Sequence, residues 1–234
     1  MTDPTWARTG RAFAWSYGGL AIVAGVLVTV VSIGIPSTDN LAVHYAYIRQ
    51  IWPELYVSFL LFMAAFLCLV PIGLVLREFF GRGIRSELLY ASFLAAAIVG
   101  VLWMLAQAGS AQVVSRDSAG LSPQELDILG RSSGIWSGVI NWLQRGFLLF
   151  ASLGTYWTGR IALQQRSLPA GLGWLSLVLA VFYWLGLANL VLLDLGASLS
   201  GELGSILIAL GSLVALVWAA WLGWVIGRSR QPSP

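Results

Sequence analysis

The sequence contains no lysine, and it has one histidine and one cysteine among its 234 residues. A retinal or pyridoxal Schiff base and a phosphate-binding P-loop each require a lysine amine, so these chemistries are excluded. The single histidine, His44, cannot by itself form a bis-histidine haem site or a histidine-rich zinc site. The single cysteine, Cys68, cannot form an intrachain disulfide or hold an iron–sulfur cluster.

Charged residues are also scarce. They make up 10% of the chain, whereas an ordinary soluble domain has about 25%. Hydrophobic residues account for 58% of the sequence, and the mean hydropathy is +0.82. A chain with so little charge cannot cover a water-facing surface, so its natural solvent is a lipid bilayer.

Six apolar stretches are long enough to cross the membrane as helices, since about 20 residues span hydrocarbon that is about 30 Å thick. The sequence therefore predicts an all-α integral membrane protein, a bundle of six transmembrane helices. The predicted spans are Phe13–Ile35, Glu54–Leu76, Leu88–Ala111, Ile135–Trp157, Gly171–Leu193 and Leu203–Ile226. This pattern divides the chain into an N-terminal segment (1–12), a membrane domain (13–227) and a C-terminal tail (228–234).

The two longest connections, Pro36–Pro53 and Gln112–Ser133, each contain a pattern typical of a short interfacial helix. In the second, Ser122-Pro-Gln-Glu125 matches a capping box with proline at the first helical position. In the first, apolar and aromatic residues recur at helical spacing: Leu41, Tyr45, Ile48 and Trp52. We therefore expect two short outer helices beside the six spans.

The thirteen basic residues are all arginines, and their distribution predicts the orientation of the chain. Positive residues in short loops tend to stay on the cytoplasmic side. Placing both termini in the cytoplasm puts nine arginines inside: Arg8, Arg11, Arg77, Arg82, Arg85, Arg160, Arg166, Arg228 and Arg230. Only Arg49, Arg116 and Arg131 then lie outside. We expect both termini to be cytoplasmic.

The fourth predicted span contains an unusual polar group, Asn141, Gln144 and Arg145. An arginine at mid-membrane costs about 2.5–3.5 kcal/mol on insertion scales, so it needs polar partners. The candidates on neighbouring spans are Gln107, Asn189 and Asp194. Two interpretations remain open: a hydrogen-bonded network that joins helices, or a site for an anionic or amphipathic ligand.

Other residues have weaker functional interpretations. His44 could contact a pigment or a quinone, although a polar edge of an amphipathic helix is the simpler explanation. Small residues recur every fourth position in two stretches, which permits close helix packing inside the protein or between subunits. These stretches are Gly130, Gly134 and Gly138, and Ala219, Gly223 and Gly227.

The second half of the chain resembles an uncharacterised bacterial family of six-helix membrane proteins. The resemblance rests on Leu121-Ser-Pro-Gln-Glu125, on the polar fourth helix, and on the segment Arg160–Pro169 that leads into Gly171-Leu-Gly-Trp174. It implies a multi-pass protein of the bacterial cytoplasmic membrane. It implies no activity and no cofactor.

Short inner loops and few titratable residues favour association over catalysis. We expect a noncatalytic accessory or scaffold subunit whose partner is another membrane protein or a second copy of the chain. The alternative is a small transporter or receptor with a pocket around Arg145. The cofactor is unknown; lipid, pigment and quinone are the classes that the aromatic surfaces could receive. The chain has no nucleic-acid motif and no metal-ligand pattern.

Overall fold

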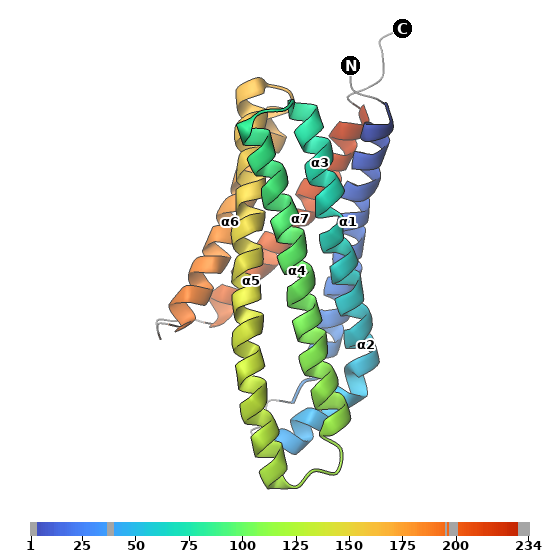
Figure 1. The fold of residues 1–234 in the computed structure, drawn as a ribbon, viewed down its shortest axis with the longest axis vertical. Helices are drawn as coiled ribbons and strands as arrows, with labels where there is room; N and C mark the ends of the chain where they lie inside the picture. The colour runs from blue at the N-terminus through green and yellow to red at the C-terminus, as the bar shows by residue number, and fades with distance from the viewer. Residues whose placement is uncertain (1–3, 37–39, 195, 197–200, 229–234) are drawn as a thin grey trace.

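The structure is a computed structural model that describes residues 4–36, 40–194, 196 and 201–228. All regular structure in these residues is helical, which confirms the predicted fold class at that level (Figure 1). The helices are α1 (Pro4–Ser32), α2 (Leu41–Leu67), α3 (Leu69–Phe80), α4 (Ile84–Asp117), α5 (Pro123–Gln165), α6 (Ala170–Asp194) and α7 (Gly201–Arg228).

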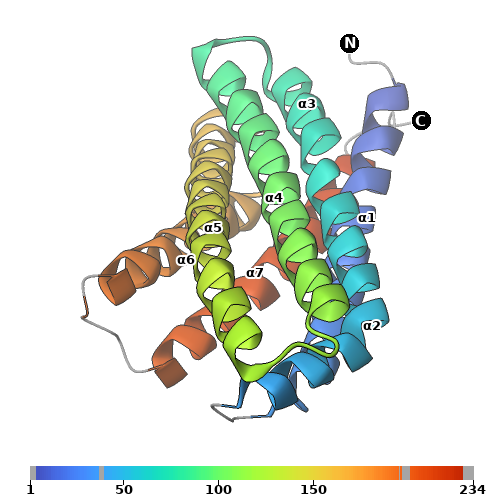
Figure 2. The same ribbon diagram turned by 60° about the horizontal axis from the view of Figure 1, so that its bottom comes forward.

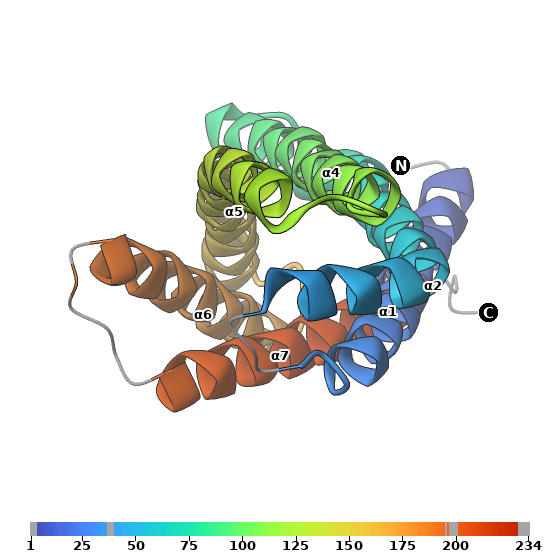
Figure 3. The same ribbon diagram turned by 90° about the horizontal axis from the view of Figure 1, so that it is seen from below.

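The helices form a closed ring. Helix α1 packs against α2, α3 and α7, α4 packs mainly against α2, α3 and α5, and α6 packs between α5 and α7. Seen along the bundle, the ribbons of α1, α2, α4, α5, α6 and α7 follow one another around this ring (Figure 3). The start of α1 and the end of α7 lie at the same end as the α3–α4 and α5–α6 connections (Figure 1).

Five helical segments among the described residues are long and apolar enough to cross a membrane. They are Trp6–Ser32, Leu41–Phe80, Ile84–Asp117, Ala170–Leu193 and Ala209–Arg228. Helices of this composition support a multi-pass membrane protein. Helix α5 is not one of the five, because polar and charged residues are spread along it.

The first predicted outer helix is not a separate element, because it forms the first turns of α2. Pro53 lies inside α2, where a proline favours a bend, and the first turns of this helix cross the end of the bundle (Figures 1 and 3). Side chains hold this segment in place. The Tyr47 hydroxyl donates to the Val31 carbonyl of α1 at 2.9 Å, and Arg49 donates to the Ser115 carbonyl at 3.2 Å and to the Ser118 hydroxyl at 2.9 Å.

The second predicted outer helix is likewise continuous with the span that follows it. Helix α5 runs for 43 residues without a break. Its predicted capping box is confirmed: the Ser122 hydroxyl accepts from the Glu125 amide at 3.4 Å, and the Glu125 carboxylate accepts from the Ser122 amide at 2.7 Å. The start of α5 was therefore placed correctly, but the expected gap between it and the span was wrong.

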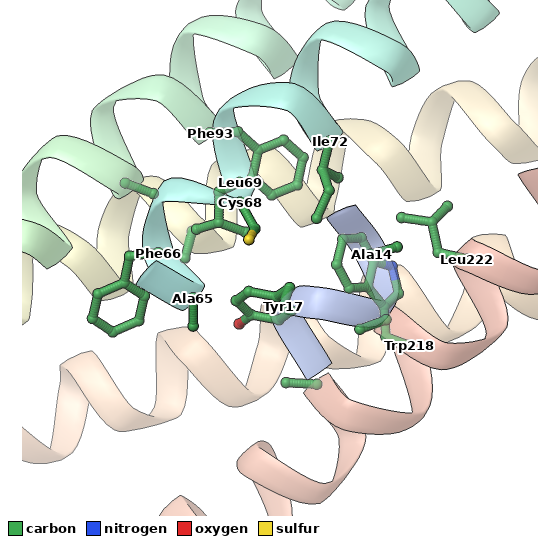
Figure 4. Close-up of a cluster of buried hydrophobic side chains, with 14 of the residues drawn as sticks. Ala14, Tyr17, Ala65, Phe66, Cys68, Leu69, Ile72, Phe93, Trp218 and Leu222 are labelled. Carbon is green, nitrogen blue, oxygen red and sulfur yellow. The ribbon is translucent and has the colours of Figure 1, made fainter. Parts of the chain in front are cut away.

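The predicted second span is divided at Cys68, where α2 ends and α3 begins. Pro71 lies one turn further on and has no N–H to donate to the carbonyl four residues earlier, which favours a break at this point. Cys68 is a buried free thiol. Figure 4 shows Tyr17 of α1 lying between this junction and Trp218 of α7.

Part of the core lies where α1, α3, α4 and α7 meet. Ile72, Phe93 and Trp218 are all but completely buried there. The Trp218 indole donates to the Ser176 hydroxyl of α6 at 2.9 Å, so its one polar atom is satisfied across the α6–α7 contact. This contact ties the second turn of α6 to the second half of α7.

The capping box makes the first turn of α5 sensitive to pH. Hydrogen bonds from the Ser122 hydroxyl, and then from its backbone amide, lower the pKa of Glu125 below its ordinary value of 4.5. Because the folded pKa is depressed, this cap is fully present above 4.5 and is lost as the pH falls through the lower folded pKa. Replacement of Ser122 by alanine removes the hydroxyl and keeps the backbone amide, so it should raise the pKa of Glu125 toward its ordinary value. Carboxyl-detected NMR of labelled protein in detergent measures it.

The matched control is Ser132→Ala in the same helix, whose hydroxyl bonds only to the Leu129 carbonyl. It should leave the Glu125 midpoint unchanged. A Glu125 midpoint that is the same in the Ser122→Ala variant and the parent would show that the capping box does not form in the membrane protein.

Candidate polar site between α5 and α6

Arg145 lies in the middle of α5 with only 6% of its surface exposed. Its Nη2 donates to the backbone carbonyl of Leu190 on α6 at 3.1 Å. Its Cζ lies 4.9 Å from the ring centroid of Trp142, which is one turn earlier on the same helix. The guanidinium is thus held between a backbone carbonyl and an aromatic face, both of which favour a cation.

Arg145 contacts α6 near the far end of that helix, because Leu190 lies in its last turn. Toward the α5–α6 connection the two helices approach closely: a Cβ built on Gly159 would lie 2.7 Å from the Gly173 carbonyl oxygen. Toward the other end α6 tilts away while α5 continues (Figures 1 and 2). The Arg145 contact therefore bridges α5 and α6 where the two helices have begun to separate.

Asn189 is the second buried polar residue beside this contact. It precedes Leu190 on α6 and is 8% exposed. Its Oδ1 has no hydrogen-bond partner among the described residues. An unpaired buried amide oxygen costs about 1–3 kcal/mol, so it marks a place where a donor from a ligand or another chain would be favourable.

The structure brings together only part of the predicted cluster. Asn141 is one turn from Arg145 along α5 and is exposed, whereas Gln144 and Gln107 are partly buried. No hydrogen bond to these three amides occurs among the described residues. The side chain of Asp194 lies outside the part that the structure describes. What remains is a guanidinium, a carbonyl and a buried amide, a combination that could bind an oxyanion or hold two helices together.

Sequence reasoning missed an aromatic layer that faces the ring interior from four helices. Phe66 and Phe147 have ring centroids 4.6 Å apart, and Phe147 also lies near Trp103 and Tyr183, at 5.9 and 6.3 Å. The Trp103 indole nitrogen is buried and has no hydrogen-bond partner among the described residues. The depth of Trp103 in its span was the available signal, but which aromatic rings meet depends on helix rotation.

His44 lies in the first turns of α2, where it is partly buried. Its ring packs edge-on against Tyr45, with centroids 5.9 Å apart. No group of three His, Cys, Asp or Glu side chains in the described part of the chain is placed to hold a metal ion. A pigment or quinone contact at His44 stays a prediction.

The two small-residue stripes differ in their surroundings. On α7 the stripe is an internal contact, because a Cβ on Gly223 would lie 2.8 Å from Trp15 and one on Gly227 would lie 2.8 Å from Arg11. On α5, Gly130 meets Leu41 and Tyr45, but a Cβ on Gly134 or Gly138 would have no described atom within 4 Å. The α5 stripe is therefore open where α6 has tilted away.

No protein-family model, no curated protein and no solved structure matches this chain. The resemblance to the six-helix bacterial family thus stays a prediction, and the function must be argued from the geometry.

Replacement of Arg145 by alanine should weaken the contact between α5 and α6. Loss of one charge-assisted hydrogen bond and of the Trp142 contact should lower the free energy of unfolding by about 1–3 kcal/mol. Arg145→Lys keeps the charge without the planar fork of the guanidinium, so its free energy of unfolding should lie between those of the parent and Arg145→Ala. Helix content followed by circular dichroism during transfer from mild detergent to dodecyl sulfate measures the effect.

Arg131→Ala is the control, because Arg131 makes an exposed salt bridge to Asp127 one turn away on α5. Such exposed pairs contribute about 0.3–0.5 kcal/mol. Equal losses of unfolding free energy in the Arg131 and Arg145 variants would mean that the Arg145 contact with α6 contributes no more stability than an exposed ion pair.

Proposed function

We propose that this protein is a noncatalytic accessory or scaffold subunit, with six membrane spans, that docks on another membrane protein through the open face of α5. This face consists of Gly134, Gly138 and Asn141. The proposal rests on one observation: two glycines in a regular four-residue repeat have no described atom within 4 Å of their Cβ positions. Glycine at such spacing lets the backbone of a second helix approach closely.

Asn141 supports a protein partner over lipid at this face. It is exposed, and it lies about two turns inside the predicted start of the fourth span. Lipid chains offer no hydrogen bond to an amide, so its polar atoms are better satisfied by a helix of another chain. Neighbouring hydroxyls do not have this need, since Ser133 and Ser137 donate to the carbonyls of Gly130 and Ser133 on their own helix.

The arginine distribution supports the orientation that we propose, with both termini in the cytoplasm. Eight described arginines lie at the end of the bundle that carries the start of α1 and the end of α7: Arg8, Arg11, Arg77, Arg82, Arg85, Arg160, Arg166 and Arg228. Three lie at the opposite end. Under the positive-inside rule, the end with eight arginines faces the cytoplasm, and the open face of α5 lies in the outer half of the bilayer.

Purification from native membranes in mild detergent, followed by mass spectrometry of the recovered proteins, tests the proposal. The parent chain should be recovered with at least one other membrane protein in fixed proportion. A Gly134→Leu, Gly138→Leu variant should fold as the parent does, because both positions are open, and should lose that partner.

The control is Gly109→Leu on α4, which is also exposed with no described atom within 4 Å of its Cβ position. It should keep the partner. A parent chain recovered alone, or equal partner loss in the α4 and α5 variants, would contradict the docking role.

A second candidate function is a transporter or receptor for an anionic or amphipathic ligand. Its specific support is the buried, unpaired Oδ1 of Asn189 next to the Arg145 contact. A polar group kept at that cost is better explained by a ligand than by packing.

Replacement of Asn189 by leucine separates the two roles of this amide. The variant should need a higher proportion of dodecyl sulfate to unfold than the parent, because an unpaired polar atom is removed. If the second function is correct, a short-chain hydroxy acid should stabilise the parent against thermal unfolding, because its carboxylate suits Arg145 and its hydroxyl can donate to Asn189 Oδ1. It should stabilise Asn189→Leu less. A parent that no hydroxy acid stabilises argues against this function.

A further inference from the structure

A cavity of about 340 Å³ lies at the end of the bundle opposite the open face of α5. The α3–α4 connection and the start of α4 form one wall, from Phe80 to Ser86, and the last turns of α5 form the other, with Ile161, Gln164 and Gln165. Gln165 donates to the Phe80 carbonyl at 3.2 Å and Arg85 donates to Gln164, so hydrogen bonds join the two walls. The cavity is thus a feature of packed helices and not of a free loop.

The polar side chains of the cavity suit a phosphate group. Arg82 and Arg85 line it, together with the amides of Gln164 and Gln165. Arginine recognises phosphate oxygens through two parallel N–H donors. Arg82 now makes only an exposed contact of 3.3 Å with Glu78, and such surface pairs are weak enough for an anion to compete with them.

The surroundings distinguish a lipid from a free phosphate. Ile84, which lines the cavity, is 82% exposed. It begins a stripe of exposed apolar residues at helical spacing along α4, and the stripe leads away from the cavity into the predicted hydrocarbon region: Leu88, Ile98, Leu102 and Leu105. A headgroup in the cavity would therefore have a continuous apolar track for its acyl chain.

The size of the cavity agrees with a headgroup inside it and an acyl chain outside it. Ligand pockets range from about 300 to 1,000 Å³, so a volume of about 340 Å³ accommodates a headgroup and not a whole lipid. The charge at this end of the bundle points to the same ligand, since anionic lipids concentrate at the cytoplasmic surface where arginines gather.

We propose that this cavity binds the phosphate of an anionic phospholipid headgroup, with Arg82 and Arg85 as its ligands and the exposed stripe of α4 as the seat of an acyl chain. The site is separate from the α5 face and does not depend on the proposed docking function. It requires only that the α3–α4 end of the bundle lies at a membrane surface.

Native mass spectrometry of the full chain tests the proposal. The protein is released from nanodiscs that contain either phosphatidylcholine alone or phosphatidylcholine with phosphatidylglycerol. The parent should retain phosphatidylglycerol in preference to phosphatidylcholine. The Arg82→Gln, Arg85→Gln variant should bind phosphatidylglycerol at least tenfold more weakly, because it loses both charge-assisted contacts.

Two further variants separate a defined site from general attraction to positive charge. Arg116→Gln, Arg131→Gln removes the same charge at the opposite end of the bundle and should leave retention unchanged. Gly83→Phe keeps both arginines and fills the cavity: Gly83 has an extended backbone with φ of −168°, and its Cβ position has no described atom within 4 Å. It should reduce retention as strongly as the arginine variant.

Inorganic phosphate serves as the competitor that identifies the source of the phosphate. It should not displace phosphatidylglycerol at millimolar concentration, because it cannot use the apolar stripe. Displacement by phosphate would overturn the lipid assignment in favour of a soluble anion. Equal loss in the two double arginine variants, or full retention by Gly83→Phe, would overturn the cavity as the site.

Discussion

The whole structure depends on the requirement that a backbone in hydrocarbon satisfies its own hydrogen bonds. With only 10% charged residues, the chain cannot remain in water, and in lipid each unpaired amide or carbonyl costs several kcal/mol. Helices meet this requirement within each segment. Buried hydroxyls follow the same rule, since those of Ser58, Thr155 and Thr158 each donate to a carbonyl of the preceding turn.

Against this background, Arg145 and Asn189 differ from the other buried polar residues of the described chain. A short hydroxyl can return to its own helix, but a guanidinium at mid-helix must find an acceptor on another element. Arg145 uses the Leu190 carbonyl in the last turn of α6 for this purpose. The close approach of the two helices at Gly159 and Gly173 lies on one side of this contact along α5, and the open glycines lie on the other.

The two ends of the bundle have different chemistry. One end gathers eight arginines and a cavity between α3–α4 and α5, and the other is covered by the first turns of α2 (Figure 3). The tyrosine and arginine contacts of that covering segment reach α1 and α4, so it joins these two helices at that end. The proposed lipid site and the proposed docking face of α5 therefore lie on separate parts of the bundle.

Much of the fold could be predicted because its signals are local. Hydropathy over about 20 residues predicts a membrane helix, and Ser122 and Glu125 predict a helix start because a capping box forms within one turn. Continuity was not predictable in the same way. The first turns of α2 are continuous with the rest of the helix despite Pro53, and they contact distant helices through Tyr47 and Arg49.

The candidate site shows the same division. The sequence alone predicted that a guanidinium lies within the fourth span and needs polar partners, because burying a charge in hydrocarbon is costly wherever it occurs. Only the tertiary structure decided which partner it has, since a backbone carbonyl such as that of Leu190 carries no sequence signature. It also decided which glycine stripe is packed and which is open. Spacing is the same in both stripes, and the tilt of α6 away from α5, which no short pattern encodes, leaves one of them uncovered.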